Sequence, residues 1–450
     1  MFMDGNIARI QADIENFLRS KANGRTLNLG NNFKLYYIKT QVDTSFITRD
    51  IQQVYFSNNI DFDKYFQTMV SPIDKNENMY SIGTGLVKGD IIAIYNNQLV
   101  RIIGAQKVQS RGVPDIEREA SFEGGAEGFN EVITTNLNLV SHYYRSPSLT
   151  TKNYTVGKKG HNNLVVVYDS AYVDKELLKE IMKRLSGIDA DMVQSLNGLQ
   201  QLLWKHQLLI PRMLVTQRPD RVTDYISKGK IAIFLDGTPT SLILPVSFHD
   251  FMKTVDDEYL LPVPAVFLII LRYLALLLSI TMPSAYVAII SYNPEVVRVQ
   301  LALSISSSRI GVPYPSFIEV LIMLILMEFL VESSLRLPKT IGQTATTVGG
   351  LILGQAAIQA HLVSNIMIII VSTVAISNFM IPVISMNLAV RVIKYILLIL
   401  VSFTGVYGLY LGMYCLVYYV ASIHTFNLAY FNPVEKIGEG RIKLMHRREQ

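Results

Sequence analysis

The sequence predicts an α/β N-terminal half with two related subdomains, followed by an all-α polytopic membrane domain. Of the first 262 residues about 22% are charged, whereas positions 263–433 contain only eleven charged residues, about 6% of that stretch. Apolar runs long enough to cross a bilayer begin only after this change. With 450 residues the chain is also too long for one hydrophobic core. These observations exclude a wholly soluble enzyme.

Short runs rich in β-branched and aromatic residues predict the strands of the first half, and they are bounded by turn residues. The expected strands lie at 33–38, 90–95, 99–103, 164–168, 231–235 and 241–244. Helical periodicity falls between them and predicts helices at 175–185, 192–203 and 221–228. The mixture indicates an α/β fold.

Two of the strands have similar surroundings. KGDIIAIY at 88–95 and KGKIAIFL at 228–235 both begin with Lys-Gly, and both lead through a polar turn into a second apolar strand. The similarity predicts related subdomains at 1–120 and 145–258, joined by a linker loop and helix at 121–144. Gly124 and Gly125 of the linker lack the lysine and hydroxyl of a phosphate-binding loop, which favours a simple bent connection.

No grouping of residues in the first half predicts catalysis. Its histidines are scattered, and no His, Cys or acidic cluster has metal-ligand spacing. The single cysteine, Cys415, lies in an apolar run and excludes a disulfide scaffold. The net charge of +5 is too small to predict nucleic-acid binding. We therefore expect a non-enzymatic protein with no cofactor, metal or nucleic-acid partner. The lack of a signal sequence predicts a cytoplasmic first half.

The membrane domain, 259–433, is expected to contain four to six hydrophobic segments. Its apolar runs lie at 263–290, 314–331, 344–360, 362–381 and 392–422. The third is short and glycine-rich, which favours a re-entrant or half-length helix. The last is too long for one upright helix across about 30 Å, so it is either strongly tilted or broken near Gly405.

Basic flanking residues predict the topology. Arg336 and Lys339 follow the second run, and the tail at 434–450 is also basic. By the positive-inside rule both should lie in the cytoplasm with the N-terminal half, so the number of crossings should be even. A half-length third run or a split last run would each satisfy this condition.

Four ionisable residues in or beside the first two runs have either a functional or a packing role. A charge at bilayer depth costs at least about 2.5–3.5 kcal/mol, so these side chains should face protein or water. Glu328 and Glu332 share one helix face, whereas Glu319 lies roughly opposite. Two interpretations stay open: the glutamates border a water-filled path, or Glu319 pairs with Arg272 and only fixes helix packing.

The third run combines small and polar residues. Gly350 and Gly354 have the spacing that lets helices approach closely, as do Gly408 and Gly412 in the last run. Uncharged polar side chains that lipid does not solvate favour either helix contacts or a water-filled path. The candidate pore or gating residues are Glu319, Glu328, Glu332, Gln343, Thr347, Val348, Leu351, Gln355 and Gln359. Thr347, Gln355 and Gln359 form one broad polar face, with Val348 and Leu351 beside it as a hydrophobic gate.

An ordered series of short motifs crosses both halves. The first half contains EGF at 127–129, RPDRV at 218–222 and IFLDGTP at 233–239. The second contains SRIGVPYPSFIE at 308–319, ESSLRLPKTIGQ at 332–343, VGGL at 348–351 and GQAA at 354–357. From about residue 120 onwards the chain thus resembles the A subunit of bacterial spore germination nutrient receptors. The residues expected to be structural are Arg272, Arg309, Arg336, Pro338, Gly350 and Gly354.

The resemblance implies a multi-pass protein of the spore inner membrane with a cytoplasmic N-terminal domain. It implies three kinds of partner: a permease-like B subunit to which nutrient binding is attributed, a lipoprotein C subunit, and the lipid bilayer. It also implies a homo-oligomer whose membrane domains form a nutrient-gated ion channel that triggers germination.

Two alternative functions stay open. One is an ancillary germination channel of the same superfamily that does not itself sense nutrients. The other is a proton-coupled secondary transporter, in which Glu319 and Glu328 relay protons and the third run is a broken substrate helix. The sequence lacks the duplicated membrane half that such transporters usually have. Neighbouring genes for B and C subunits would favour the receptor over the ancillary channel.

Overall fold

The computed structural model describes residues 4–21, 23–30, 32–57, 62–73, 79–96, 98–102, 105, 125, 127–204, 209–334, 336–426 and 428–431. The chain divides into two compact units, which are described separately. The α/β unit comprises Met1–Leu208, Arg212–Val246 and Glu435–Gln450, and the helical unit comprises Leu209–Pro211 and Ser247–Val434. Residues 106–124 and 432–450 lie outside the described residues, so the expected domain limits near 120 and 434 stay predictions.

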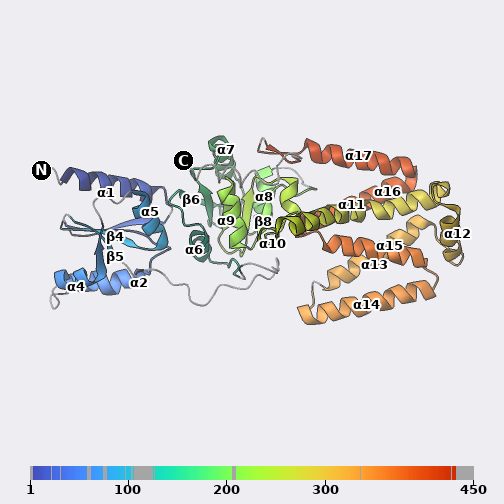
Figure 1. Cartoon of the computed structure of the whole chain (residues 1–450), viewed down its shortest axis with the longest axis horizontal. Coiled ribbons are helices and arrows are strands. Elements are labelled where there is room, and N and C mark those ends of the chain that lie inside the picture. The colour runs from blue at the N-terminus through green and yellow to red at the C-terminus, as the bar shows by residue number, and fades with distance from the viewer. Residues whose placement is uncertain are drawn as a thin grey trace. The chain divides into compact units, whose positions relative to one another are not determined.

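The α/β unit contains two five-stranded sheets with the same strand order (Figure 1). The first sheet has the order β1-β2-β4-β5-β3 and the second β6-β7-β9-β10-β8. All the pairings in both are antiparallel. The first comprises β1 (Gly24–Gly30), β2 (Phe33–Ile38), β3 (Val70–Pro72), β4 (Ile91–Tyr95) and β5 (Gln98–Ile102). The second comprises β6 (Leu149–Val156), β7 (Asn162–Asp169), β8 (Leu214–Thr216), β9 (Ile231–Leu235) and β10 (Ser241–Leu244).

The shared order confirms that the two Lys-Gly motifs mark equivalent places. Each motif ends the helix before the third strand of its sheet: α5 (Met79–Lys88) leads into β4, and α9 (Pro219–Ser227) leads into β9. Gly89 and Gly229 have φ angles of +98° and +82°, in the region where a side chain is strained. At Gly229 an added Cβ would also lie 2.6 Å from the backbone oxygen of Tyr172. The glycine is therefore required at this turn.

Helices cover both faces of the first sheet. Along β2 the side chains alternate, with Phe33 and Leu35 on one face and Tyr36 and Ile38 on the other. One face packs on α1 (Asp4–Arg19) and α5. The other packs on the short helices α2 (Thr44–Phe46), η1 (Ile47–Gln52), α3 (Gln53–Phe56) and α4 (Phe62–Met69). Burial on both faces explains why β4 is apolar along almost its whole length.

The second sheet follows the linker helix. This helix, α6, spans Ile133–Tyr143 and packs on α9, which in turn packs on β7 and β9. The remaining helices are α7 (Lys175–Ser186) and α8 (Leu196–Trp204). Helix α9 begins two residues before the predicted start because Pro219 fits the first helical position, where no backbone N–H is needed.

The helical unit consists mainly of long helices, and α12 crosses their direction in Figure 1. Its elements are η2 (Phe248–Phe251), α10 (Asp256–Tyr259), α11 (Pro262–Tyr292), η3 (Pro294–Val296), α12 (Val299–Ser308), α13 (Ser316–Ser334), α14 (Lys339–Gln359), α15 (Asn365–Phe379), α16 (Ile384–Thr404), α17 (Val406–Ser422) and the two-residue strands β11 (His424–Thr425) and β12 (Leu428–Ala429). Helix α11 packs on α15 and α16, and α14 packs on α13. Within the described residues, α11 and α16 are long and apolar enough to cross a membrane.

The structure shows the form of the third and last apolar runs. The third run forms one continuous helix, α14, of 21 residues, so the prediction of a half-length helix is wrong. The last run is broken at Gly405, as one of the two alternatives required. Gly405 has a φ of +63°, and an added Cβ would lie 2.7 Å from the ring of Tyr292. Only glycine fits this close turn between α16 and α17.

Candidate functional site

Helix α14 has two unlike faces. Small residues face α13: an added Cβ on Gly342 would lie 2.9 Å from the backbone oxygen of Ser334, and one on Gly349 would lie 3.3 Å from Leu330. Ala357, two turns further along the same face, is 5% exposed. Close packing therefore uses this side of α14, and the remaining side is left open in the single chain.

The open side carries the candidate pore residues of the third run. The exposed members are Thr347, Val348, Leu351, Gln355 and Gln359. Val348 is 49% exposed and Leu351 63% exposed. The side chain of Gln343 lies outside the described residues. The helix thus brings these five candidates onto one continuous surface in which amide and hydroxyl groups alternate with bulky apolar groups.

The two glycine pairs behave differently. An added Cβ on Gly354 would meet nothing within 4 Å, and Gly350 has only Leu330 at 4.0 Å. At Gly412, by contrast, an added Cβ would lie 2.3 Å from Leu397 of α16. Gly408 and Gly412 therefore serve the close approach of two helices within one chain, because both lie against α16. Gly354 leaves open the space that a second copy of the helix needs for close approach.

Glu319 lies at the centre of a hydrogen-bond network and is fully buried. Its Oε1 accepts hydrogen bonds of 2.6 Å from both the backbone N–H and the hydroxyl of Ser364. Its Oε2 accepts a hydrogen bond from the hydroxyl of Tyr286 at 3.4 Å and lies 3.4 Å from Arg309 Nε in an ion pair. Ser364 is the N-cap of α15 and accepts from the N–H of Met367. The carboxylate thereby fixes the start of α15 against α13.

Arg272 does not pair with Glu319, contrary to one of the two interpretations. Its guanidinium binds Asp257 of α10 through two nitrogens, at 2.5 and 2.9 Å. It also donates to the backbone oxygen of Met252 and the hydroxyl of Thr254. Asp257 precedes the apolar run, so it was not among the partners that the sequence suggested for Arg272. The forked pair fixes α10 against α11.

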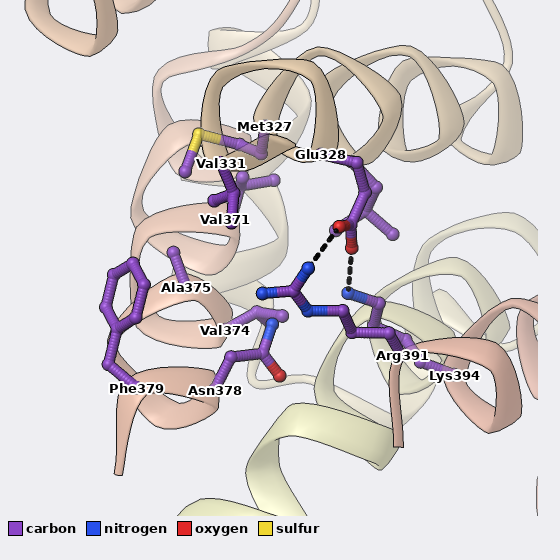
Figure 2. A pocket seen from close by; sticks show the side chains of 11 residues that line it. Met327, Glu328, Val331, Val371, Val374, Ala375, Asn378, Phe379, Arg391 and Lys394 are labelled. Carbon is purple, nitrogen blue, oxygen red and sulfur yellow. Dashed lines mark hydrogen bonds and ion pairs between the residues drawn. The ribbon is translucent and has the colours of Figure 1, made fainter. Parts of the chain in front are cut away.

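Glu328 and Glu332 have different surroundings although they share a helix face. Glu332 pairs with Arg336 one turn later, and both side chains are exposed. Glu328 is partly buried and faces α16. Its Oε2 lies 3.1 Å from Arg391 Nη1 and its Oε1 lies 3.5 Å from Lys394 Nζ (Figure 2). The carboxylate therefore sits between two cations of another helix.

Sequence reasoning missed four members of these networks. It assigned no role to Ser364, Asn378, Arg391 or Lys394, although all four are bonded inside the helical unit. The signal was present for the two cations, because opposite charges in separate apolar runs are expected to pair. For Ser364 and Asn378 the sequence contains no comparable signal. Among the described residues no three His, Cys, Asp or Glu side chains cluster to hold a metal ion.

The motif residues of the α/β unit mainly hold the second sheet together. Phe129 packs edge-on against Phe234 of β9, with ring centres 5.1 Å apart. The side chain of Asn136 accepts a hydrogen bond from the backbone N–H of Asn130 at 2.9 Å and donates one to the backbone oxygen of Asn130 at 2.7 Å. Arg218 binds Asp220 through two nitrogens, at 3.1 and 2.6 Å. These contacts give the motif residues of the α/β unit a role in packing.

A family of known proteins matches this chain along almost its whole length. The family model described as "Bacillus/Clostridium GerA spore germination protein" matches residues 9–448. The chain belongs to the GerA family of spore germination proteins. The resemblance inferred from the sequence is thereby confirmed.

Individual relatives cover much of this GerA-family chain. The spore germination protein GerLA of Bacillus cereus is 32% identical over 367 residues, which are 81% of this chain and 75% of that protein. The spore germination protein KA of Bacillus subtilis is 33% identical over 343 residues, 76% of this chain and 63% of that protein. The B. subtilis protein YfkQ, described as an uncharacterized membrane protein, is 29% identical over 83% of this chain and 73% of its own length.

A solved structure also matches. The N-terminal domain of the A subunit of the Bacillus megaterium spore germinant receptor GerK3 is 25% identical, with a TM-score of 0.39. The match covers 52% of this chain and 92% of that domain.

Proposed function

We propose that this GerA-family protein is the non-enzymatic A subunit of a nutrient receptor in the spore inner membrane. Copies of the chain assemble through α14 around an ion path that opens when a nutrient is sensed. The permease-like B subunit and the lipoprotein C subunit complete the receptor. The match to GerA-type proteins along residues 9–448 supports the family role, and α14 supports the channel.

The observation that carries the channel proposal is the open side of α14. In a bilayer, the exposed side chains of Gln355 and Gln359 would leave polar groups unsatisfied at a cost of about 1–3 kcal/mol each. Copies of the helix arranged in a ring would turn these groups towards water and pack the open Gly354 against a neighbour. Val348 and Leu351, exposed beside the polar groups, would then narrow the path as a hydrophobic gate.

The helix count supports the topology proposal. Among the described residues, the helical unit contains six helices of 15 to 31 residues: α11, α13, α14, α15, α16 and α17. If each crosses the bilayer, the number of crossings is even. The connection at Arg336 and the basic tail then lie on the same side as the N-terminal half, as the positive-inside rule requires.

A charge placed at Gln355 tests the proposal. Gln355→Lys should suppress cation release by repulsion, whereas Gln355→Glu, a matched control of opposite sign, should preserve or increase it. Ion release from spores is measured after nutrient addition, with protein amount checked by immunoblot. Wild-type ion release from both variants, at wild-type protein levels, would remove α14 from the ion path. An equal loss in both variants would show a folding defect, and Val348→Ala, expected to raise resting leak, would then carry the test.

A further inference from the structure

The charges around Glu328 do not balance. One carboxylate faces two cations, Arg391 and Lys394, so the formal sum of the cluster is +1. The Lys394 side chain is only 2% exposed and lies between helices of the helical unit. An unbalanced charge in such surroundings costs several kcal/mol unless a counter-charge is supplied.

Hydrogen-bond donors are also in excess. Arg391 Nε donates to Asn387 at 3.1 Å and Nη1 donates to Glu328. Figure 2 shows the remaining guanidinium nitrogen directed away from Glu328, to the side where Val374 lies. Lys394 has three N–H groups, and its acceptor among the described residues is Glu328 at 3.5 Å. The cluster thus holds donors with no described acceptor.

A small cavity lies beside these donors. Its lining includes Glu328, Arg391, Lys394, Asn378, Val374 and Phe379, and its volume of about 20 Å³ is enough for one water molecule or one monatomic ion. The carbonyl oxygen of the Asn378 side chain already accepts a hydrogen bond from Ser279. A monatomic ion fits this volume, whereas phosphate would have to extend beyond it. Most of its remaining wall is apolar.

We propose that this cavity binds one chloride ion between Arg391 and Lys394. A monovalent anion brings the formal charge of the cluster to zero. A halide accepts hydrogen bonds and donates none, so it matches a site rich in donors. Its weak hydration compared with other small anions suits the apolar wall. The bound ion would join α13, α15 and α16, and it is independent of the proposed ion path along α14.

The test is thermal unfolding of the full-length protein in detergent, with chloride exchanged for gluconate at constant ionic strength. Binding to the folded protein should raise the midpoint temperature with chloride concentration until the site saturates, and bromide should replace chloride. Lys394→Met removes the excess charge and should abolish the dependence on chloride. Arg336→Gln, which breaks the exposed pair with Glu332, is the matched control and should keep it.

A second variant changes the charge in the opposite direction. Glu328→Gln raises the formal sum to +2, so chloride should bind at least about tenfold more tightly. This variant carries the test if Lys394→Met fails to fold, and broadening of the chloride NMR signal by the wild-type protein gives an independent measure of binding. A wild-type midpoint that is the same in chloride and gluconate would overturn the proposal. Unchanged chloride dependence in either folded charge variant would also do so.

Discussion

Glu319 illustrates how a buried charge is held in the helical unit. Its Oε1 accepts two 2.6 Å hydrogen bonds from Ser364, and its Oε2 forms an ion pair with Arg309. Removal of the carboxylate would leave the buried donors of Ser364 unpaired, which costs more than the net value of the bonds. We therefore expect Glu319 to fix α13 against α15 by packing rather than to border a water-filled path.

Substitution of Glu319 should separate packing from function. Glu319→Ala is expected to lower the free energy of unfolding by about 2–4 kcal/mol, because the donors of Ser364 and the charge of Arg309 lose their partner. Glu332→Gln, which breaks an exposed pair, should change it by less than about 0.5 kcal/mol. Thermal unfolding of both proteins in the same detergent measures the difference. Equal stability of the two variants would contradict the anchoring role.

Lys21 predicts a pH dependence of the α/β unit. The ammonium is buried beside Pro147, whose backbone oxygen accepts a hydrogen bond at 2.9 Å. Burial lowers the pKa of Lys21 from 10.5 to about 8, opposed by the charge of Asp169. The folded protein therefore loses this proton near pH 8, whereas the unfolded chain keeps it up to about pH 10.5. Stability from this group rises by roughly 3 kcal/mol across that window.

The measurement compares wild type with Lys21→Met. In the full-length protein, the unfolding midpoint of the α/β unit should rise between pH 8 and pH 10 relative to Lys21→Met, which has no titrating group at this position. Lys159→Met, at an exposed ammonium paired with Asp191, should follow the wild type. Parallel curves for wild type and Lys21→Met would show that the buried ammonium does not titrate in this range.

At the scale of elements, the sequence predicted the interior of each sheet and missed its borders. The six predicted strands became β2, β4, β5, β7, β9 and β10, which occupy the inner positions of both sheets. The four missed strands, β1, β3, β6 and β8, are the edges. Inner strands are buried on both faces and appear as apolar runs. Edge strands such as LTTKNYTV in β6 are polar, and β3 and β8 have three residues each, so their patterns are weak.

The features of the candidate site were also predicted only in part from the sequence. The positions of Thr347, Gln355 and Gln359 on one side of α14 followed from helical periodicity alone. The ion pairs did not, because each depends on which helices are neighbours. Arg272 pairs with Asp257 outside its own run, and Glu328 pairs across α13 and α16. Tertiary neighbours of this kind have no local sequence pattern.

Two glycines of the helical unit give an element-scale prediction. Gly412→Val should disrupt the packing of α16 on α17 and lower the free energy of unfolding by about 1–3 kcal/mol, because an added Cβ meets Leu397 at 2.3 Å. Gly354→Val should leave the folded chain intact but weaken assembly, because its Cβ meets nothing within 4 Å. Light scattering and thermal unfolding in mild detergent measure the two effects. An unchanged oligomer in Gly354→Val would exclude this face of α14 as the interface.

At the scale of the whole molecule, the two units differ in where their apolar residues lie. The α/β unit covers its sheets with helices and holds apolar residues inside. The helical unit exposes large apolar residues along α11, α16 and α17 and buries part of its charge in pairs. This inversion is the arrangement expected when lipid replaces water around the second unit.

The number of crossings gives the prediction for the whole chain. If each of the six helices crosses the bilayer, both termini lie on the same side, which the positive-inside rule predicts to be the cytoplasm. Cysteines introduced at Gly5 and Arg447, after Cys415→Ser, should stay unlabelled by an impermeant reagent applied to intact cells. A cysteine at His361, in the exposed connection between α14 and α15, should be labelled and serves as the positive control. Labelling at Arg447 without labelling at Gly5 would mean that one of the six helices does not cross. The glycine-rich α14, which is less apolar than α11 and α16, would then be the helix to test first, because a ring of α14 helices requires each copy to span the bilayer.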